Sequence, residues 1–256
     1  MTSLLRPWAL VVVASLLGCS APGCGTQRNN TPAPATAPNT NAPTTPANDS
    51  ATTPAAQAPT APTDDDDEGG TRAAGPPPAG LAVATFAGGC FWCMEAAFEH
   101  LDGVRDAISG YTGGSERHPS YEEVSNHRTS HAEAVRVLYD PNRVTYDQLL
   151  DLFWHRIDPT AHDRAFADVG HQYRSAIFVH TPEQRAAAER SRAAIASSHR
   201  FEGPITTTIE DAPVFWVAED YHQNFWRTSP ERYNEYHENS GRREFLRAHW
   251  GPNAPY

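Results

Sequence analysis

The chain has 256 residues, a formal net charge of −11 and four cysteines. All 20 of its cationic residues are arginine, and the acidic balance argues against a surface that binds nucleic acid. The composition divides the chain into an N-terminal leader, a low-complexity segment and one domain-sized segment, residues 81–256.

Residues 1–18 have the pattern of an export signal. Arg6 supplies a positive charge, and the apolar run that follows is too short to remain as a membrane-spanning helix. The end of this run, Leu16-Leu17-Gly18-Cys19, resembles the lipobox of bacterial lipoproteins, in which the cysteine is acylated. We therefore expect an exported lipoprotein, anchored through Cys19 on the periplasmic or other extracytoplasmic face of a membrane. Ordinary signal cleavage nearby is the alternative.

Residues 19–80 lack the composition of a packed domain. Proline, alanine, threonine and asparagine dominate, and an acidic run follows at residues 64–68. Such a segment buries too little apolar surface to offset the entropy of ordering it. We predict a disordered stalk, extended by its prolines, between the anchor and the domain.

Strand-like and helix-like patterns follow each other in the domain-sized segment. Apolar or β-branched runs bounded by glycine or polar residues predict strands at 81–86, 104–111, 131–139, 173–180 and 205–209. Helical spacing and capping residues predict helices at 91–101, 121–124, 145–154 and from 181 onward, with a mostly helical or irregular tail at 218–250. The central order is that of a ferredoxin-like, split β-α-β-β-α-β sandwich of the α+β class, with additional helices.

Cys90 and Cys93 are the only cysteines of this segment, in the stretch AGGCFWCMEAAFEH. A structural zinc site would need a second pair of ligands, which the sequence lacks, and a structural disulfide would close too short a loop to stabilise much. Cys90 follows a strand and two glycines at a helix start, where unpaired N–H groups and the helix dipole lower a thiol pKa. We expect Cys90 to be a reactive thiolate with Cys93 one turn away; a cysteine that simply packs is the alternative.

Glu133 lies in a predicted strand, where successive side chains face opposite sides. It shares its parity with Val135, Val137 and Tyr139, which places its carboxyl on the apolar face. Burial disfavours the charged form of a carboxyl, so Glu133 would keep its proton to higher pH and suit general acid catalysis beside a thiolate. A solvated Glu133 at an exposed strand end is the alternative.

Longer stretches of the sequence resemble one enzyme family. GGCFWCMEAAFEHLDGV, SGYTGG, YEEV followed by HAEAV, and GHQYRSAIF are similar to the A-type peptide methionine sulfoxide reductases, which reduce the S epimer of methionine sulfoxide. The similarity covers nearly all of residues 83–250, and the tail AEDYHQNFW…SGRREFLRAHW resembles the branch with a second cysteine in CFWC. It implies an enzyme that repairs oxidised methionine, free or in proteins. We expect a monomer without a bound metal or cofactor.

The resemblance also implies the reaction. Cys90 would attack the sulfoxide sulfur, Glu133 would protonate the sulfoxide oxygen, and Cys90 would become a sulfenic acid. Cys93 would then close a disulfide, which a thioredoxin-like reductant would open by exchange. The tail has no further cysteine, and Ser125 stands where some relatives have one, so recycling must use Cys93 or an external thiol.

Further pocket residues follow from the same resemblance. Phe91 and Trp92 would form the apolar wall that accepts the methyl group of the substrate. Tyr121 and Tyr173 would hydrogen-bond the sulfoxide oxygen, and Asp168 would shape the pocket. The stretch SNHRTSHAE lacks the glycine expected before HAE, so the loop that presents the acid is expected to differ from that of the family.

Two rival hypotheses use the same features. One is a thioredoxin-like thiol–disulfide oxidoreductase that uses the Cys90–Cys93 pair, against which the strand order argues. The other is a non-enzymatic lipoprotein that binds a partner through its aromatic residues. His222, in EDYHQ, has no role in any of these hypotheses and is expected to pack or to form a local hydrogen bond.

Overall fold

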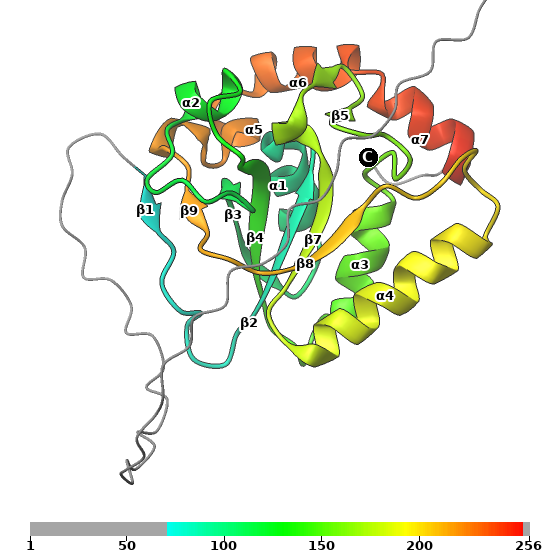
Figure 1. The fold of residues 1–256 in the computed structure, drawn as a ribbon, viewed down its shortest axis with the longest axis horizontal. Helices are drawn as coiled ribbons and strands as arrows, with labels where there is room; N and C mark the ends of the chain where they lie inside the picture. The colour runs from blue at the N-terminus through cyan, green and yellow to red at the C-terminus, as the bar shows by residue number, and fades with distance from the viewer. Residues whose placement is uncertain (1–70, 253–256) are drawn as a thin grey trace, which may run out of the picture. The chain divides into compact units, whose positions relative to one another are not determined.

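A computed structural model describes residues 71–252 of the chain. Within these residues, seven strands form one mixed sheet in the order β1-β9-β3-β4-β2-β7-β8 (Figure 1). Within the group of four central strands, each strand runs antiparallel to the strand beside it. These strands are β2 (Ala82–Gly88), β3 (Val104–Thr112), β4 (Ala132–Tyr139) and β7 (Ser175–Val179). From β7 to β3 their chain order is fourth, first, third, second. This is the ferredoxin-like arrangement, which confirms the predicted fold class.

The helices of this core occupy the predicted segments, and two of them begin at the caps predicted from the sequence, Thr145 and Thr181. They are α1 (Phe91–Glu99), α2 (Tyr121–Ser125), α3 (Tyr146–Trp154) and α4 (Pro182–Ser197). Ser120 and Thr145 form capping boxes with the residues three positions on, and Thr181 caps α4 with proline next. Because each cap satisfies N–H groups that lack partners inside the helix, the local sequence determines where these helices start.

Strand alternation separates the two faces of the sheet. Phe86, Val135 and Ile177 belong to the main core, which α1, α3 and α4 complete on one face. The ring of Phe86 stacks on those of Phe98 and Phe153, with centroids 5.0 Å and 5.2 Å apart. The opposite face carries a smaller cluster that includes Ala87, Ala132, Ala134, Ala176, Phe178 and Phe215. The helices therefore lie on the face that the apolar strand positions select.

The folded part begins earlier than the sequence indicates. β1 (Arg72–Ala73) pairs antiparallel with β9 (Trp216–Val217), and the backbone oxygen of Gly75 accepts a hydrogen bond from Arg136 at 2.7 Å. Residues 71–75, which the composition assigns to the stalk, therefore lie against the sheet. A two-residue strand leaves no hydrophobic period in the sequence. The signal segment, Cys19 and the predicted stalk up to residue 70 lie outside the described residues.

The last predicted strand is displaced. β8 (Thr208–Asp211) pairs parallel with β7 and begins later than the predicted range 205–209. Thr206 is drawn out of the sheet because its N–H and its hydroxyl donate to the backbone oxygens of Pro159 and Ala161, respectively, at 2.8 Å and 2.6 Å. A two-stranded hairpin, β5 (Arg164–Ala165) with β6 (Asp168–Val169), was also not predicted.

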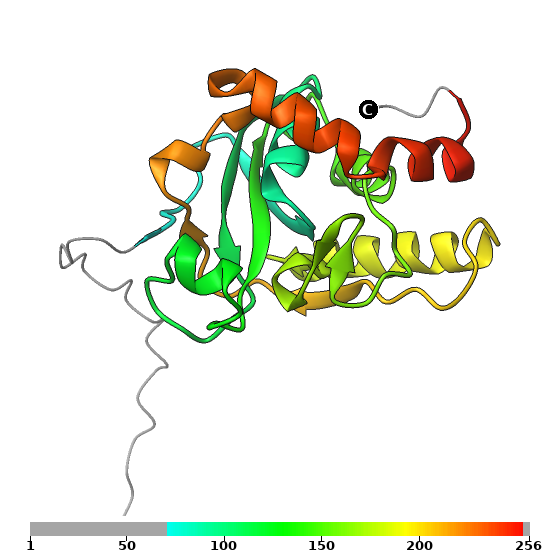
Figure 2. The same cartoon turned by 90° about the horizontal axis from the view of Figure 1, so that it is seen from above.

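The C-terminal helices pass over one end of the sheet (Figures 1 and 2). They are α5 (Phe225–Thr228), α6 (Pro230–Asn239) and α7 (Arg242–Trp250). Glu95 of α1 holds the start of α5 in place. Its carboxyl accepts hydrogen bonds from the backbone N–H of Asn224 at 2.7 Å and from the hydroxyl of Ser109 at 2.8 Å. Trp226 donates to Glu99 at 2.9 Å. The tail therefore encloses the helix that carries the two cysteines.

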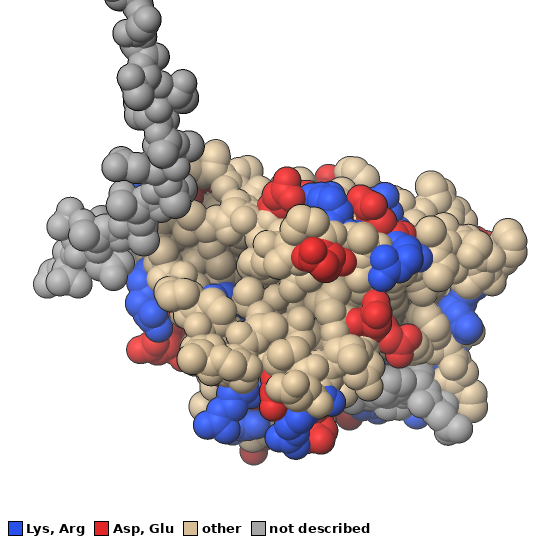
Figure 3. Space-filling model, turned by 90° about the horizontal axis from the view of Figure 1, so that it is seen from below, with Lys and Arg blue, Asp and Glu red and all other residues tan. Residues whose placement is uncertain are grey.

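On the face of the described residues that Figure 3 shows, arginine and acidic side chains form small, separate groups rather than one basic patch. Within residues 71–252, no helix combines the length and the apolar character needed to cross a bilayer.

Candidate active site

A cavity of about 190 Å³ opens where β2 leads into α1. We call it the Cys90 cavity; its lining is Cys90, Phe91, Trp92, Tyr121, Glu133, Asp168, Tyr173 and Tyr236. The structure thus brings together all the pocket residues named from the sequence and adds one, Tyr236. Cys93 is not part of this lining.

Cys90 is held by a sharp turn between β2 and α1. Gly89 has a φ of 83°, and a Cβ there would lie 2.3 Å from the Cβ of Ala165, so a side chain does not fit. Cys90 follows as the N-cap residue of α1 and is 6% exposed. The glycine turn therefore places the thiol at the helix start, with little access for solvent.

Glu133 is buried beside the start of α1. Its carboxyl lies on the helix-covered face of β4, in agreement with strand alternation, and the residue is 2% exposed. Its Oε2 accepts a hydrogen bond from the backbone N–H of Phe91 at 3.0 Å. Burial raises the pKa of Glu133 to about 8, although this bond acts in the opposite direction. The carboxyl is therefore mostly protonated at neutral pH.

The Cys90 thiol differs from the expected thiolate. Burial raises its pKa, and the neighbouring Cys93 and Glu133 raise it further. The N–H group of Phe91, at the helix start, donates to Glu133 and not to the thiol. A hydrogen bond with Cys90 lowers the pKa of Cys93, and the charge of Arg242 lowers it further. In the free protein Cys90 is therefore a neutral thiol.

Two tyrosine hydroxyls complete the polar side of the Cys90 cavity. Tyr121 begins α2, and Tyr173 ends the 3-10 turn His171–Tyr173 before β7. Burial raises the pKa of Tyr121 to about 12 and also raises the pKa of Tyr173. The backbone N–H of Tyr121 donates to Glu219 at 2.7 Å, which holds α2 in place. Both hydroxyls keep their protons and can donate to an oxygen in the cavity.

Tyr236 of α6 was not identified from the sequence. Its hydroxyl donates to the carboxyl of Asp168, in β6. Burial raises the pKa of Asp168, although this bond and Arg242 act in the opposite direction. The two residues are far apart in the chain, and only the packing of the tail against the β5–β6 hairpin brings them together. The helical pattern of the tail marks no residue of α6 as functional.

Trp92 supplies the apolar wall. Its ring stacks on that of Phe225 with centroids 3.9 Å apart, and its Nε1–H donates to Nδ1 of His222 at 3.2 Å. Burial lowers the pKa of His222 to about 4, so the imidazole is neutral and can accept this bond. His222 thus forms the local hydrogen bond expected of it. Phe91 is 1% exposed and also packs in the core beside Tyr111, with ring centroids 5.8 Å apart.

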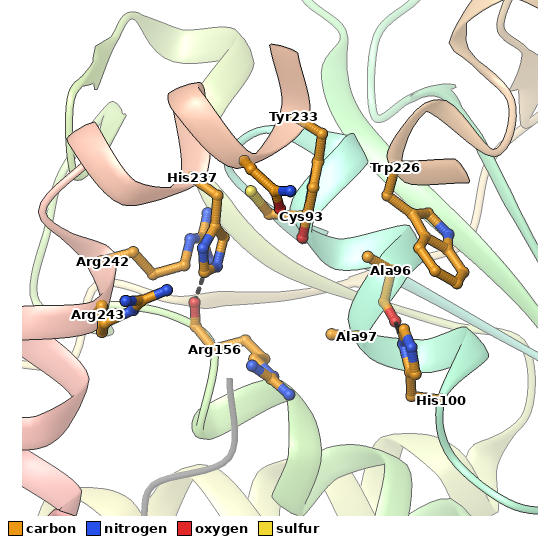
Figure 4. A pocket seen from close by; sticks show the side chains of 11 residues that line it. Cys93, Ala96, Ala97, His100, Arg156, Trp226, Tyr233, His237, Arg242 and Arg243 are labelled. Carbon is orange, nitrogen blue, oxygen red and sulfur yellow. Dashed lines mark hydrogen bonds between the residues drawn. The ribbon is translucent and has the colours of Figure 1, made fainter. Parts of the chain in front are cut away.

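Cys93 lines a different cavity, of about 230 Å³, which we call the Cys93 pocket (Figure 4). Its other lining residues include Arg156, Tyr233, His237 and Arg242. Cys90 and Cys93 are both free thiols, and the interaction with Cys90 is the largest cause of the lowered pKa of Cys93. The two thiols are therefore close neighbours, while each lines its own cavity.

The remaining expectations concern metals and the loop before β4. Within the described range 71–252, no group of three or more His, Cys, Asp or Glu side chains is arranged to hold a metal ion. The loop of the SNHRTSHAE stretch contains His127 with a φ of 58°. Glu133 nevertheless reaches the N–H of Phe91. With this loop sequence, the acid still lies in the Cys90 cavity.

A thiol, a neutral carboxylic acid and two tyrosine hydroxyls around one small cavity, with a second thiol close by, define a thiol-dependent oxidoreductase. The chain belongs to the peptide methionine sulfoxide reductase family, whose pattern it matches over residues 82–254.

Curated relatives agree with this assignment. "Peptide methionine sulfoxide reductase MsrA" of Bacillus licheniformis is 47% identical over 169 residues, which cover 66% of this chain and 93% of the relative. The protein of the same name from Bacillus subtilis is also 47% identical over 169 residues, covering 66% of this chain and 96% of the relative. The Leuconostoc mesenteroides protein is 50% identical over 152 residues, with coverages of 59% and 89%.

Solved structures are similar as well. Mxr1 from Saccharomyces cerevisiae in reduced form has a TM-score of 0.57 and 32% identity, covering 60% of this chain and 88% of that chain. Methionine sulfoxide reductase A of Corynebacterium diphtheriae has a TM-score of 0.54 and 33% identity, with coverages of 60% and 77%. The fold, the site and the relatives therefore identify an oxidoreductase that acts on methionine sulfoxide.

Proposed function

We propose that this chain reduces the S epimer of methionine sulfoxide, free and in proteins, with Cys90 as nucleophile and Glu133 as general acid. The observation that carries the proposal is the presence of a thiol and a protonated carboxyl in one cavity of about 190 Å³. The sulfur of a sulfoxide is electrophilic and can react with the Cys90 thiol, and its oxygen is basic and can take a proton from Glu133.

The pocket residues explain the choice of epimer. The sulfoxide oxygen lies toward the hydroxyls of Tyr121 and Tyr173, the methyl group lies against Trp92, and the sulfur faces Cys90. With the oxygen, the methyl group and the sulfur so placed, the third substituent of the sulfur, which is the rest of the methionine side chain, leaves the cavity in one direction only. A substrate of the opposite configuration would place its methyl group or its oxygen on the wrong wall.

The chemical step conserves protons. Glu133 gives its proton to the sulfoxide oxygen and, as a carboxylate, takes the thiol proton of Cys90. The Cys90 sulfur bonds to the substrate sulfur, and the oxygen is transferred to Cys90, so that the sulfide leaves and a sulfenic acid remains. The raised pKa of the free Cys90 thiol fits this order of events, because the thiolate forms only when a substrate accepts the acid's proton.

Cys93 resolves the sulfenic acid in this proposal. Its sulfur attacks that of Cys90, and a disulfide and one water molecule form. The proximity of the two thiols and the lowered pKa of Cys93 support this step. A thioredoxin-like protein then reduces the disulfide by exchange. The protein acts as an exported, lipid-anchored monomer, held to the extracytoplasmic side of a membrane through Cys19.

Epimer-resolved turnover tests the proposal. The full chain is incubated with each epimer of methyl sulfoxide substrate and dithiothreitol, and both sulfoxide and sulfide are quantified by chromatography. Consumption of the S epimer alone is expected. Equal use of both epimers, or no turnover by folded protein, would contradict the proposal.

The structure also bears on the alternative of a general thiol–disulfide oxidoreductase. In such an enzyme the first cysteine of the pair attacks a protein disulfide as an exposed thiolate, whereas Cys90 is 6% exposed and burial raises its pKa. Burial next to a neutral acid suits a small substrate group that enters the cavity. The sulfoxide reaction is therefore the function that the geometry favours.

A further inference from the structure

The Cys93 pocket contains two buried arginines. Arg242 is 2% exposed and Arg156 is 6% exposed. The Nε atoms of both have no hydrogen-bond partner among the described residues, while the Arg242 guanidinium donates to the backbone oxygen of Arg156, the dashed bond in Figure 4. Because a buried charge without a counter-charge costs several kcal/mol, such a pair indicates a place for an anion.

Nearby acidic residues have other partners. Arg243, which also lines the pocket, pairs with Glu238 at 3.7 Å, and Arg227, next in the chain to the lining residue Trp226, pairs with Glu99 at 3.2 Å. Asp168 is close enough for Arg242 to lower its pKa, but its carboxyl accepts the hydroxyl of Tyr236. The acids around the pocket are thus engaged elsewhere, and the two buried guanidinium groups keep unused donors.

The pocket also presents a sulfur atom. Cys93 lines it, and the charges of Arg242 and Arg156 both lower the pKa of this thiol. The volume of about 230 Å³ is below the roughly 300–1,000 Å³ of sites for drug-sized ligands, so a small molecule fits. In Figure 4, Arg242 and His237 lie to one side of Cys93, and Ala96 and Ala97 come from its own helix.

We propose that the Cys93 pocket binds a small thiol that carries a carboxylate, and that this thiol reduces the Cys90–Cys93 disulfide by attacking the sulfur of Cys93. The inference rests on the proposed function, because it requires Cys93 to have formed that disulfide. It adds a small-molecule route to the route through a thioredoxin-like protein. The planar donor forks of Arg242 and Arg156 match a carboxylate, which accepts two parallel hydrogen bonds.

The exchange balances in two steps. The thiolate of the bound molecule bonds to the Cys93 sulfur, the Cys90–Cys93 bond breaks, and its electron pair stays on Cys90, which takes a proton from Glu133. A second molecule of the thiol attacks the outer sulfur of the mixed disulfide and releases Cys93 as a thiolate. Two thiols are oxidised to one disulfide, and the protein disulfide is reduced to two thiols.

The test compares thiols of different charge. The full chain carrying Cys19→Ser and Cys24→Ser is oxidised with diamide, which makes the Cys90–Cys93 disulfide without any sulfoxide. Its reduction by 3-mercaptopropionate, 2-mercaptoethanol and cysteamine is then timed by alkylation and mass spectrometry. Each rate is divided by the rate of the same thiol with hydroxyethyl disulfide, which removes differences in intrinsic nucleophilicity.

We expect the normalised rate of 3-mercaptopropionate to exceed that of 2-mercaptoethanol about tenfold, equivalent to about 1.4 kcal/mol, and that of cysteamine to be the lowest. Arg242→Gln and Arg156→Gln should each remove most of this preference. Arg185→Gln, which removes a surface arginine paired with Asp211, should leave it unchanged. If Arg242→Gln does not fold, Arg242→Lys takes its place in the test. It keeps the charge but loses the planar fork, so it should retain part of the preference for 3-mercaptopropionate.

Three outcomes would overturn the inference. They are equal normalised rates for the three thiols, a preference that survives both glutamine variants, and a mixed disulfide that maps to Cys90 in quenched samples. Failure of the proposed function is distinguishable, because it appears as absent sulfoxide turnover or as absent Cys90–Cys93 disulfide after sulfoxide treatment. The diamide-oxidised protein reports on the pocket in either case.

Discussion

The two cavities at the start of α1 differ in their charge. The Cys90 cavity contains no arginine: apolar side chains, three tyrosines and the protonated Glu133 line it, together with Asp168, whose carboxyl accepts the hydroxyl of Tyr236. The Cys93 pocket is lined by arginines. Burial raises the pKa of Cys90, whereas hydrogen bonding and arginine charge lower that of Cys93. One helix start thus carries two different acid–base environments, and the elements packed around it determine which thiol ionises first.

This difference suits two different reactions. A sulfoxide is uncharged, and a cavity that offers apolar side chains, hydroxyl donors and a protonated acid can hold it without a cationic partner. A reducing thiol reacts as an anion, and a cationic pocket attracts it. Sulfoxide reduction takes place in the Cys90 cavity, and we place disulfide reduction in the Cys93 pocket. If the two cavities work independently, a substitution in one should leave the reaction of the other unchanged.

The largest expected effect separates the two half-reactions. In Cys93→Ser, sulfoxide reduction at Cys90 should proceed for one stoichiometric turnover, because the Cys90 cavity is intact. Continued turnover with a thioredoxin-like reductant should be lost, because no disulfide forms. A burst of one sulfide per protein without a steady phase is the expected chromatographic result. Full thioredoxin-dependent turnover in this variant would refute Cys93 as the resolving thiol.

The second largest expected effect is the loss of sulfoxide reduction when the general acid Glu133 is replaced. Glu133→Gln should slow sulfoxide reduction by about 100-fold to 10,000-fold, the usual contribution of a general acid. Reduction of the preformed disulfide should be much less affected. Glu95→Gln is a matched control, since Glu95 is a buried α1 carboxyl whose pKa burial raises to about 7 and which is not in the cavity. Equal losses in both variants would point to general damage to α1.

A stability measurement tests the protonation state of Glu133. Its pKa is raised to about 8 in the folded protein, so the folded state binds more protons than the unfolded state between about pH 4.5 and pH 8. Stability from this residue is therefore present below about pH 4.5 and is lost as the pH rises toward 8. Urea unfolding at pH 5, 6.5 and 8 should show the wild type losing up to a few kcal/mol relative to Glu133→Gln. A constant difference across this range would mean that the carboxyl is ionised throughout.

Local patterns predicted the parts of the molecule that local forces determine. Strand parity placed Glu133 on the covered face, and the caps at Thr145 and Thr181 placed two helix starts. The raised pKa of Cys90 was not predictable from its position at a helix start, because its largest cause is burial, and because Glu133 of β4 accepts the N–H of Phe91. β1 and Arg242 were also missed, since the pairing of β1 with β9 and the burial of the first residue of α7 against Arg156 are long-range events that leave no period in the sequence.

The smallest expected effect concerns Tyr236, the cavity residue found only in the structure. Tyr236→Phe removes the hydroxyl that bonds Asp168 and leaves the ring beside Trp92. We expect a threefold to tenfold loss of sulfoxide reduction, the size of one hydrogen bond of about 0.5–1.5 kcal/mol. Tyr146→Phe is the matched control, because its buried hydroxyl has no partner among the described residues. Other residues of α6 line the Cys93 pocket. An effect confined to sulfoxide reduction would therefore show that α6 contributes different side chains to the two cavities. Equal slowing of disulfide reduction would instead mean that α6 moves as a unit and that the cavities are coupled.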